Sequence, residues 1–355
     1  MRLLLRCLLI GLITFSFDFQ AHAQWQTIDK NAIPNHLSQE LSPNRSQLLL
    51  LDLPAIEQLL AQAPHESQVS LSQSNLIVEL PQADGSTRAF RLIEYNALAP
   101  GLMAKFPGLH TYYGEAVSNT RIRVRVDISV KGLRVMGVSE EGQWFVDPYA
   151  KGNTEYYIAY AKADYPVTKA WHCDFDQSLI RPSGNATTSS RAGDCQFRVY
   201  RLAIAARGEY TNYHGGVAGT IAELANVVNR LNEMYERDLS VRFELIANND
   251  LIIYTNAGTD PYTGGVFTNL AQNQSNLDAV IGAANYDVGH VVGSGGGGGV
   301  ASYGSICDNG QKARGATSLG NPIGDPFVID YVAHELGHQF GGSHTQNNNC
   351  NRVNS

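Results

Sequence analysis

Long apolar stretches are missing from the sequence after residue 23, and no segment there is long enough to span a bilayer. A dense basic patch is missing as well, and the 355-residue chain has a net charge of −7. These two absences argue against a membrane-spanning protein and against a nucleic-acid-binding protein. We therefore expect neither stable membrane insertion nor a nucleic-acid partner. The length is sufficient for two domains of ordinary size.

The first 23 residues have the pattern of a secretory signal peptide. Arg2 and Arg6 make the start positive, the stretch from Leu8 to Phe17 is mostly apolar, and Ala21-His22-Ala23 is an A-x-A cleavage site. The apolar run is too short for a membrane anchor and ends in the cleavage pattern. We expect cleavage after Ala23 and secretion of the mature protein to the extracellular space.

Cysteine is scarce, and one of the five, Cys7, lies in the predicted signal peptide. The other four are Cys173, Cys195, Cys307 and Cys350. In an oxidising compartment these four can form disulfides, and three pairings exist if all of them join. The sequence does not select one pairing.

Residues 24–180 are rich in strand patterns, and we expect a β-rich domain there. In the stretch 121–126 arginines alternate with apolar residues, which predicts that the arginines face water and that Ile122, Val124 and Val126 face a core. A short helix is expected at 54–61. Further strands are expected at 76–80, 89–93, 133–136 and 143–146.

Small and polar residues fill 181–194, which buries little surface and therefore predicts a linker. Such a segment is also a favoured site of proteolysis, and we expect a cut near Arg191. The alternative is an ordered surface loop.

Residues 195–355 alternate between strand and helix patterns. Strands are expected at 197–206, 239–246 and 286–292, and helices at 217–235 and around Leu270 to Ile281. This order predicts an α/β fold of α+β type, with a mainly parallel twisted sheet and helices packed on it.

A glycine run at 293–299, broken only by Ser294, follows one of these strands. It lacks the Gly-Lys-Ser/Thr ending of a phosphate-binding loop, and a strand rather than a helix is expected after it, at 300–306. We therefore predict a flexible hairpin here.

The strongest signal in the sequence is the stretch from His334 to His344, with the spacing H-E-x-x-H-x-x-G-x-x-H. A helix is expected here, with Asp325 as its N-cap and a proline after it. On that helix His334 and His338 project from one face, because they are four residues apart. Gly341 can turn the chain out of the helix at little conformational cost, which brings His344 back toward the other two.

Three imidazoles with an open fourth position are typical of a catalytic zinc site, whereas a structural site has four protein ligands. We predict one Zn²⁺ held by His334, His338 and His344. Glu335 is the predicted general base, since it can reach a water beside the metal without being a ligand. The short form H-E-x-x-H occurs by chance on exposed helices, but the longer form fixes the residue at five positions, including a glycine with a geometric role.

With these residues the chain resembles the metzincin clan of zinc peptidases, and within it the reprolysin-like, adamalysin-type branch. The stretch 227–235 leading into 239–241 is similar to the long helix and the strand that follows it in that branch. The stretch 299–307 is similar to its edge strand. Upstream, 100–114 and 146–149 are similar to the propeptide of secreted bacterial members.

The resemblance implies a secreted endopeptidase precursor that acts on proteins or peptides and is inhibited by its own propeptide. Residues 24–180 would then be the propeptide-like domain and 195–355 the catalytic domain. It also implies that extended substrate pairs with the edge strand as an added β-strand. The implied substrate-binding residues are Val300, Ala301, Ser302, Tyr303 and Gly304.

The sequence departs from the family pattern in two places. Thr345 follows the third histidine, where the adamalysins usually have aspartate. Metzincins also have a methionine-containing turn downstream of the zinc motif, but all four methionines lie upstream of it, the last being Met234. We therefore expect 195–355 to be an incomplete catalytic domain, with the methionine turn beyond Ser355.

Cys173 lies just before the linker and has two candidate roles, the first of which would keep the precursor inactive. The thiolate of Cys173 can ligate zinc and so fill its fourth position, as in some metzincin propeptides. The alternative is a disulfide between Cys173 and Cys195 that closes a loop across the linker.

Other candidate ligands carry no prediction of a site. Asp147, Asp174 and Asp176 offer oxygens for Ca²⁺, but their spacing matches no calcium loop. His172, His214 and His290 lack a partner at ligand spacing, and they are expected to be surface or core histidines. These six residues therefore add no second metal to the prediction.

Two other functions compete with the peptidase. One is a non-catalytic adhesion or binding protein on a metzincin scaffold, which Glu335 argues against because it retains the general base. The other is a targeting or carbohydrate-binding role for the β-rich domain, retained in the mature protein. The N-terminal sequence of the secreted form separates that role from a discarded propeptide.

Overall fold

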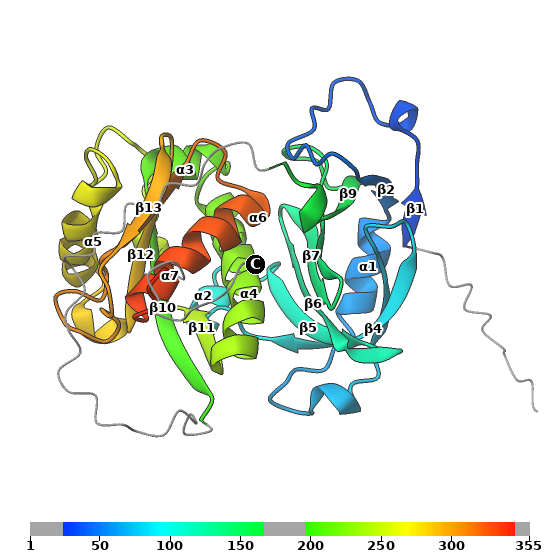
Figure 1. Ribbon diagram of the computed structural model, residues 1–355, viewed down its shortest axis with the longest axis horizontal. Helices are drawn as coiled ribbons and strands as arrows, with labels where there is room; N and C mark the ends of the chain where they lie inside the picture. Colours follow the sequence, from blue (N-terminus) through cyan, green and yellow to red (C-terminus); the bar gives the residue numbers. More distant parts are fainter. Residues whose placement is uncertain (1–23, 167–195, 345–355) are drawn as a thin grey trace, which may run out of the picture.

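The computed structural model describes residues 24–166 and 196–344, which form two modules side by side (Figure 1). We call 24–166 the N-terminal module and 196–344 the C-terminal module. The first is built on a nine-stranded sheet and the second on a five-stranded sheet. Among the helices of these two ranges, none has the length and apolar character needed to cross a membrane.

The N-terminal module is an antiparallel meander. Strands β3 to β9 follow one another across the sheet, and β2 and β1 complete it beyond β9. Helix α1 begins after Asp52, whose side chain accepts a hydrogen bond from the Ala55 amide and so caps the helix. The elements are β1 (Trp25–Thr27), β2 (Gln47–Leu51), α1 (Leu53–Leu60), β3 (Ile77–Pro81), β4 (Thr87–Tyr95), α2 (Pro100–Met103), β5 (His110–Ala116), β6 (Asn119–Ser129), β7 (Gly132–Ser139), β8 (Gly142–Pro148) and β9 (Tyr156–Ala161).

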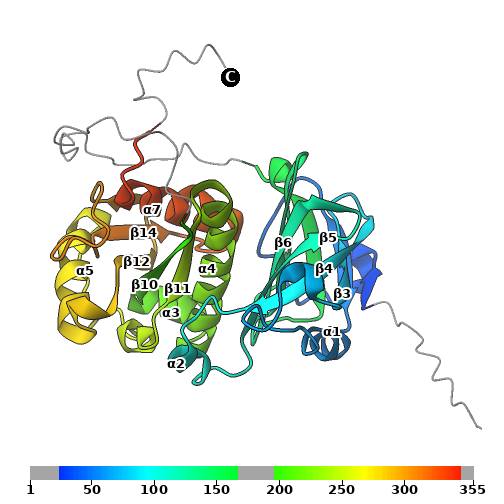
Figure 2. The ribbon, with the colours of Figure 1, turned by 90° about the horizontal axis from the view of Figure 1, so that it is seen from below.

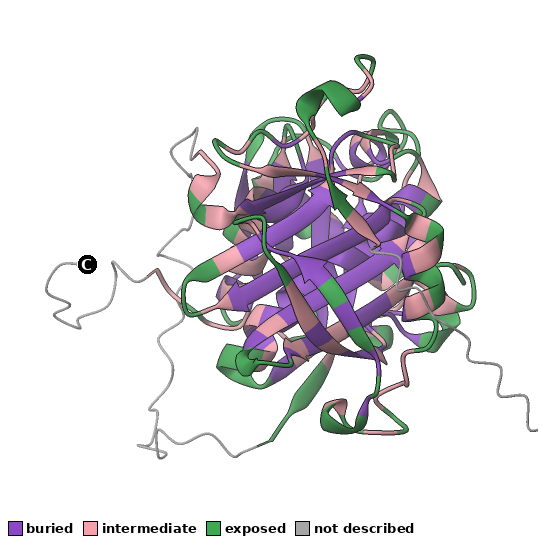
Figure 3. Cartoon of the chain, turned by 90° about the vertical axis from the view of Figure 1, so that its right-hand side faces the viewer, coloured by how far each residue is buried: buried purple, intermediate pink, exposed green. Residues whose placement is uncertain are grey.

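The two faces of this sheet have different partners. Ile56 and Leu60 of α1 pack on one face, in a core that includes Val124 and Val126 of β6. Side chains alternate along a strand, so the arginines of β6 point to the opposite face. That face lies against helix α4 of the C-terminal module, and the strands are buried in their middle parts (Figure 3). The prediction that these arginines face water is therefore wrong for Arg125, which is buried.

The C-terminal module has three layers. The sheet order is β11-β10-β12-β14-β13, in which β13 alone runs antiparallel to its neighbour. Helix α4 and the helices from α6 to α7 cover one face, and α5 covers the other (Figure 2). The elements are β10 (Arg198–Ala206), α3 (Gly208–Tyr213), α4 (Val217–Leu239), β11 (Val241–Leu245), α5 (Val266–Val280), β12 (Val288–Ser294), β13 (Gly297–Ala301), β14 (Gly315–Leu319), α6 (Gly324–Phe327), the π-helical turn η7 (Val328–Ala333) and α7 (His334–Gln339).

The chain as a whole is thus a mixed α/β protein. A mainly parallel sheet describes the C-terminal module, whereas the larger sheet of the N-terminal module is antiparallel. The predicted hairpin at the glycine run is wrong, because β12 and β13 do not pair with each other. Strand β14 lies between them. The glycine run instead ends β12, turns through Gly295 and Gly296 at positive φ, and begins β13.

Some predictions concern residues outside the two described ranges. These are the signal peptide at 1–23 and the linker at 181–194, so both remain predictions. The prediction that Asp325 is the N-cap of the helix is wrong, because α6 begins at Gly324 and Asp325 lies inside it. The Asp325 carboxylate accepts from Lys162 of the N-terminal module at 2.7 Å, so it is not used as a cap.

Candidate active site

The three histidines of the motif converge at the end of one helical segment. Elements α6, η7 and α7 run on continuously, and α7 begins with His334. The Nε2 atoms of His334 and His338 are 2.8 Å apart, as expected for neighbours on one helical face. Nε2 of His344 lies 3.1 Å from that of His334. The sequence spacing therefore brings all three rings to one point, as predicted.

Gly341 makes this convergence possible. Its φ is +86°, a left-handed conformation that glycine adopts without a steric penalty. The Gly341 amide donates to the His338 carbonyl, and the Gly342 amide donates to that of Gly337. These bonds satisfy the last carbonyls of α7 and turn the chain back toward His344.

The protonation of the rings suits a metal. Nδ1 of His338 donates to the Gly342 carbonyl at 2.7 Å, so its Nε2 carries a lone pair toward the other two rings. Burial, followed by the nearby His338 and His344, lowers the pKa of His334 to about 3. Burial also lowers the pKa of His338, although the Gly342 carbonyl opposes this. His334 and His338 are thus neutral at pH 7, which is the form that ligates a metal.

The donor set fits zinc. Among the residues of 24–166 and 196–344, these three histidines form the group that could hold a metal ion, with ligand atoms within 4.8 Å of one another. Tetrahedral zinc at its usual distance from imidazole nitrogen separates two such nitrogens by about 3.3 Å. The separations of 2.8 Å and 3.1 Å from His334 to the other two rings are close to this value. This group contains no carboxylate or cysteine, and the described residues give no support to a calcium site.

Glu335 lies beside the histidines and is fully buried. It is placed against β13, the terminal strand of the five-stranded sheet. A Cβ built on Gly299 would stand 2.4 Å from Oε1 of Glu335 and 2.6 Å from its Cγ. The carboxylate therefore occupies the space that any side chain larger than hydrogen at position 299 would fill. Sequence reasoning missed Gly299, because nothing in a glycine run distinguishes the one that must admit a neighbour.

A second set of buried polar groups anchors α7 to the sheet. Nε2 of Gln339 donates to the carbonyls of Gly289 and Lys312, at 3.1 and 3.2 Å. His290 of β12 shares a hydrogen bond with Thr317 of β14, at 2.9 Å. Burial lowers the pKa of His290 to about 4, so it is a neutral core histidine, as predicted. Gln339 was not predicted as a site residue.

The predicted substrate-binding residues fall into two groups. Val300 and Ala301 belong to β13, whereas Ser302, Tyr303 and Gly304 follow it in a turn. The Ser302 amide donates to the Arg314 carbonyl, and the Gly304 amide donates to the His338 carbonyl. These two amides are thus engaged within the protein.

Along β13 the backbone N–H and C=O groups point alternately toward β14 and toward the outer edge of the sheet. Because Ser302 points toward β14, the backbone groups of Gly299 and Ala301 point to the outer edge of the sheet. An added strand would therefore pair with Gly299 and Ala301 first.

Three of the predicted disulfide candidates, Cys173, Cys195 and Cys350, lie outside the described residues. The prediction of Cys173 as a zinc ligand stays open for the same reason. Cys307 is exposed and has a φ of +58°. His214, predicted to be a surface or core histidine, is buried between the modules, with Nδ1 2.7 Å from Nζ of Lys131.

Comparison with known proteins gives one family. Residues 196–355 match the model of the reprolysin-like metallopeptidases of family M12B. None of the curated proteins matches the chain. Among solved structures the chain is similar to metalloproteinase-II from Bacteroides fragilis, with 11% identity, a TM-score of 0.43, and coverage of 81% of this chain and 88% of that one. That likeness is too distant to carry an argument. The family match, on a segment that contains the complete zinc motif, identifies residues 196–355 as a reprolysin-like metallopeptidase domain of family M12B.

Proposed function

We propose that the chain is the precursor of a secreted zinc endopeptidase that cleaves internal peptide bonds of extracellular proteins. The observation that carries this proposal is the convergence of three histidine Nε2 atoms next to a buried carboxylate. Family M12B supports peptide hydrolysis and zinc. Secretion is supported by the signal pattern at 1–23, and the precursor form by the resemblance of the N-terminal module to a propeptide.

His334, His338 and His344 would hold the zinc ion. When bound, the ion supplies Lewis acidity to a water molecule and to the scissile carbonyl. Glu335 accepts the proton of the attacking water and delivers it to the leaving amine. Because Gly299 and Glu335 are in contact, the edge strand that binds the substrate also sets the position of the base.

Substrate is proposed to lie along the outer edge of β13, antiparallel to it. Main-chain hydrogen bonds to Gly299 and Ala301 would align the peptide, and this mode tolerates many side chains. Such pairing holds an internal stretch of chain and so favours endopeptidase over exopeptidase cleavage. The proposed partners are therefore extended protein or peptide segments, with the N-terminal module as the intramolecular inhibitor.

The test compares casein cleavage by the wild-type protein and by Glu335→Ala, each cut within 181–194 and separated from its N-terminal module. We expect the wild type to cleave, a chelator to stop cleavage, and added zinc to restore it. Glu335→Ala should bind one zinc per chain and remain inactive. If the wild type binds zinc stoichiometrically and cleaves neither casein nor a peptide library, the proposal fails and a binding protein on this scaffold becomes the better account.

A further inference from the structure

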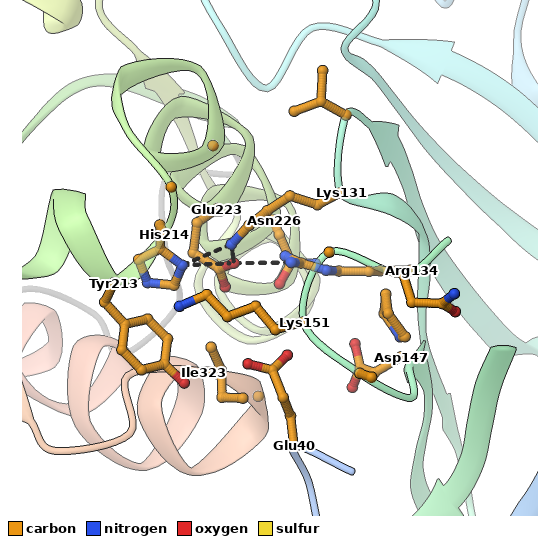
Figure 4. A pocket seen from close by; sticks show the side chains of 18 of the residues that line it. Glu40, Lys131, Arg134, Asp147, Lys151, Tyr213, His214, Glu223, Asn226 and Ile323 are labelled. Carbon is orange, nitrogen blue, oxygen red and sulfur yellow. Dashed lines mark hydrogen bonds and ion pairs between the residues drawn. The ribbon is translucent and has the colours of Figure 1, made fainter. Parts of the chain in front are cut away.

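A dense set of buried polar side chains lies between the two modules, along helix α4. Figure 4 shows one end of it, where side chains from β7, β8 and α4 point toward one another. The residues of α4 that face the N-terminal module carry charge or amide groups and are almost fully buried. They are Glu223, Asn226, Asn229, Arg230 and Glu233.

Glu223 is paired with two cations of the N-terminal module. Its Oε2 lies 2.8 Å from Nζ of Lys131 and 2.9 Å from a guanidinium nitrogen of Arg134, and its side chain is 1% exposed. Burial alone would raise the pKa of Glu223, but Arg134 and Lys131, and then His214, hold the pKa well below its usual range. The carboxylate is thus charged, and both strong partners come from the other module.

Arg125 makes the corresponding contact at the other end of α4. It donates to Glu233 at 3.0 Å and to Glu236 at 2.8 Å, and its side chain is 4% exposed. Burial opposes the charge of Arg125, yet Tyr95 and then the carboxylates of Glu236 and Glu233 raise its pKa above the usual value. Carboxylates of α4 that pair with cations of the N-terminal module therefore lie at both ends of the contact.

The pair in the middle has the opposite polarity. Arg230 of α4 donates to Asp147 of β8 at 2.5 Å, with side chains that are 1% and 6% exposed. Tyr160 donates to the second oxygen of Asp147 at 2.8 Å. A helix cation between helix anions gives the contact a charge pattern that fits the strands in one register.

Amide side chains complete the pattern. Asn226 donates to Asp127 at 2.6 Å, and Asn229 donates to the Val126 carbonyl at 3.0 Å. Tyr95 in turn donates to Asn229 at 2.7 Å. Helix α4 thus forms hydrogen bonds with both side chains and backbone of the N-terminal sheet.

Apolar contacts flank this polar centre. Leu98 forms a β-bridge with Leu245 of β11, and Leu41 and Phe145 share a core with Ile323. A cavity of about 360 Å³ remains beside Glu223 between the modules. The contact thus combines buried charged groups, flanking apolar residues and a cavity.

Buried charge of this kind is specific but adds little net stability, because desolvation offsets most of the attraction. If the modules part, each exposes charged groups that water solvates well, together with the apolar residues that flank them. We propose that the N-terminal module is a docking partner of the α4 face, recognised through the ion pairs of Glu223, Arg230 and Glu233, and that it stays bound there non-covalently after the chain is cut between 166 and 196.

This inference rests on the proposed function only in that a precursor is expected to be cut there. The experiment measures binding of the two modules and not catalysis, so this proposal and the proposed peptidase function can fail independently of each other. The full chain carries Glu335→Ala to prevent self-cleavage and a recognition site for an added protease within 181–194. A reductant is present throughout, so that no disulfide between Cys173 and Cys195 joins the pieces.

After the cut, size-exclusion chromatography at about 0.15 M salt and a dilution series give the dissociation constant of the two pieces. We expect one complex of both pieces at micromolar concentration. Asp147→Asn and Arg230→Met each leave one buried charge without its partner and should weaken binding about 100-fold or more. The double variant removes both charges and should lose less than the two single losses combined.

Glu140→Gln is the matched control, since Glu140 pairs with Arg121 on the surface of the same module and both are largely exposed. It should leave binding unchanged. Each variant is first compared with its parent before the cut, by circular dichroism and thermal unfolding, so that a misfolded protein is recognised. Wild-type pieces that separate at micromolar concentration, or folded Asp147→Asn and Arg230→Met variants that bind like wild type, would overturn the proposal.

Discussion

Gly299→Ala is the substitution that most sharply probes the proposed base. Gly299 lies on β13 with its Cα against Glu335, and its φ is not in the left-handed region, so alanine is compatible with its backbone. The new methyl group would stand 2.4 Å from Oε1, 2.6 Å from Cγ and 2.7 Å from Cδ of Glu335. The carboxylate has to give way, because β13 is held by its pairing with β14.

The size of the effect follows from these distances. Ordinary van der Waals contact begins at 3.4 Å, so Glu335 must retreat by about 1 Å. A displacement of about 1 Å in a catalytic constellation lowers the rate about 100-fold. That loss corresponds to about 2.7 kcal/mol of transition-state stabilisation. Zinc should stay bound, since the substitution touches none of the three histidines.

The assay is the turnover of an internally quenched peptide, with zinc content and thermal unfolding measured on the same sample. Gly297→Ala is the matched control: it lies two residues earlier on the same strand, and nothing stands within 4 Å of its built Cβ. We expect Gly299→Ala to lose kcat and keep its zinc, and Gly297→Ala to resemble wild type. A folded, zinc-bound Gly299→Ala protein with near wild-type kcat would refute the placement of Glu335 as the base.

Three further outcomes are expected. Gln339→Leu leaves the buried carbonyls of Gly289 and Lys312 without their donor and should lower the free energy of unfolding by about 1–3 kcal/mol, measured by urea denaturation. Removal of zinc by a chelator should abolish peptidase activity and lower the Tm, and zinc should restore both. Burial raises the pKa of Asp127 to about 6, against the lowering effect of Arg134, so the folded state binds the proton more tightly and stability falls as pH rises from about 4 to about 6. Asp127→Asn should remove that slope in pH-dependent denaturation; an unchanged slope would assign it to another group.

The zinc site was predictable because its geometry is local. Residues four apart on a helix and a glycine at the helix end bring His334, His338 and His344 together, and both properties are visible in the sequence. The position of α4 was predictable for the same reason, since its apolar residues repeat at helical spacing, although the helix runs to Leu239 and not to the predicted end at 235.

The failures concern contacts between distant parts of the chain. Alternation in β6 shows that Arg125 and Val124 point to opposite faces, but not that helix α4 covers the arginine face. Adjacent strands usually pair, which favoured a hairpin at the glycine run, yet β14 lies between β12 and β13. The contact of Gly299 with Glu335 arises from packing between a strand and a helix, and no local pattern reports it.

The most direct test of the proposed zinc peptidase takes metal-free protein that has been cut within 181–194 and separated from its N-terminal module. It titrates this protein with zinc and follows cleavage of an internally quenched peptide blocked at both ends. The account predicts no cleavage without metal, and a rate that rises with added zinc and levels off at one zinc per chain. Cleavage by the metal-free protein, or no cleavage after one zinc per chain has bound, would contradict it.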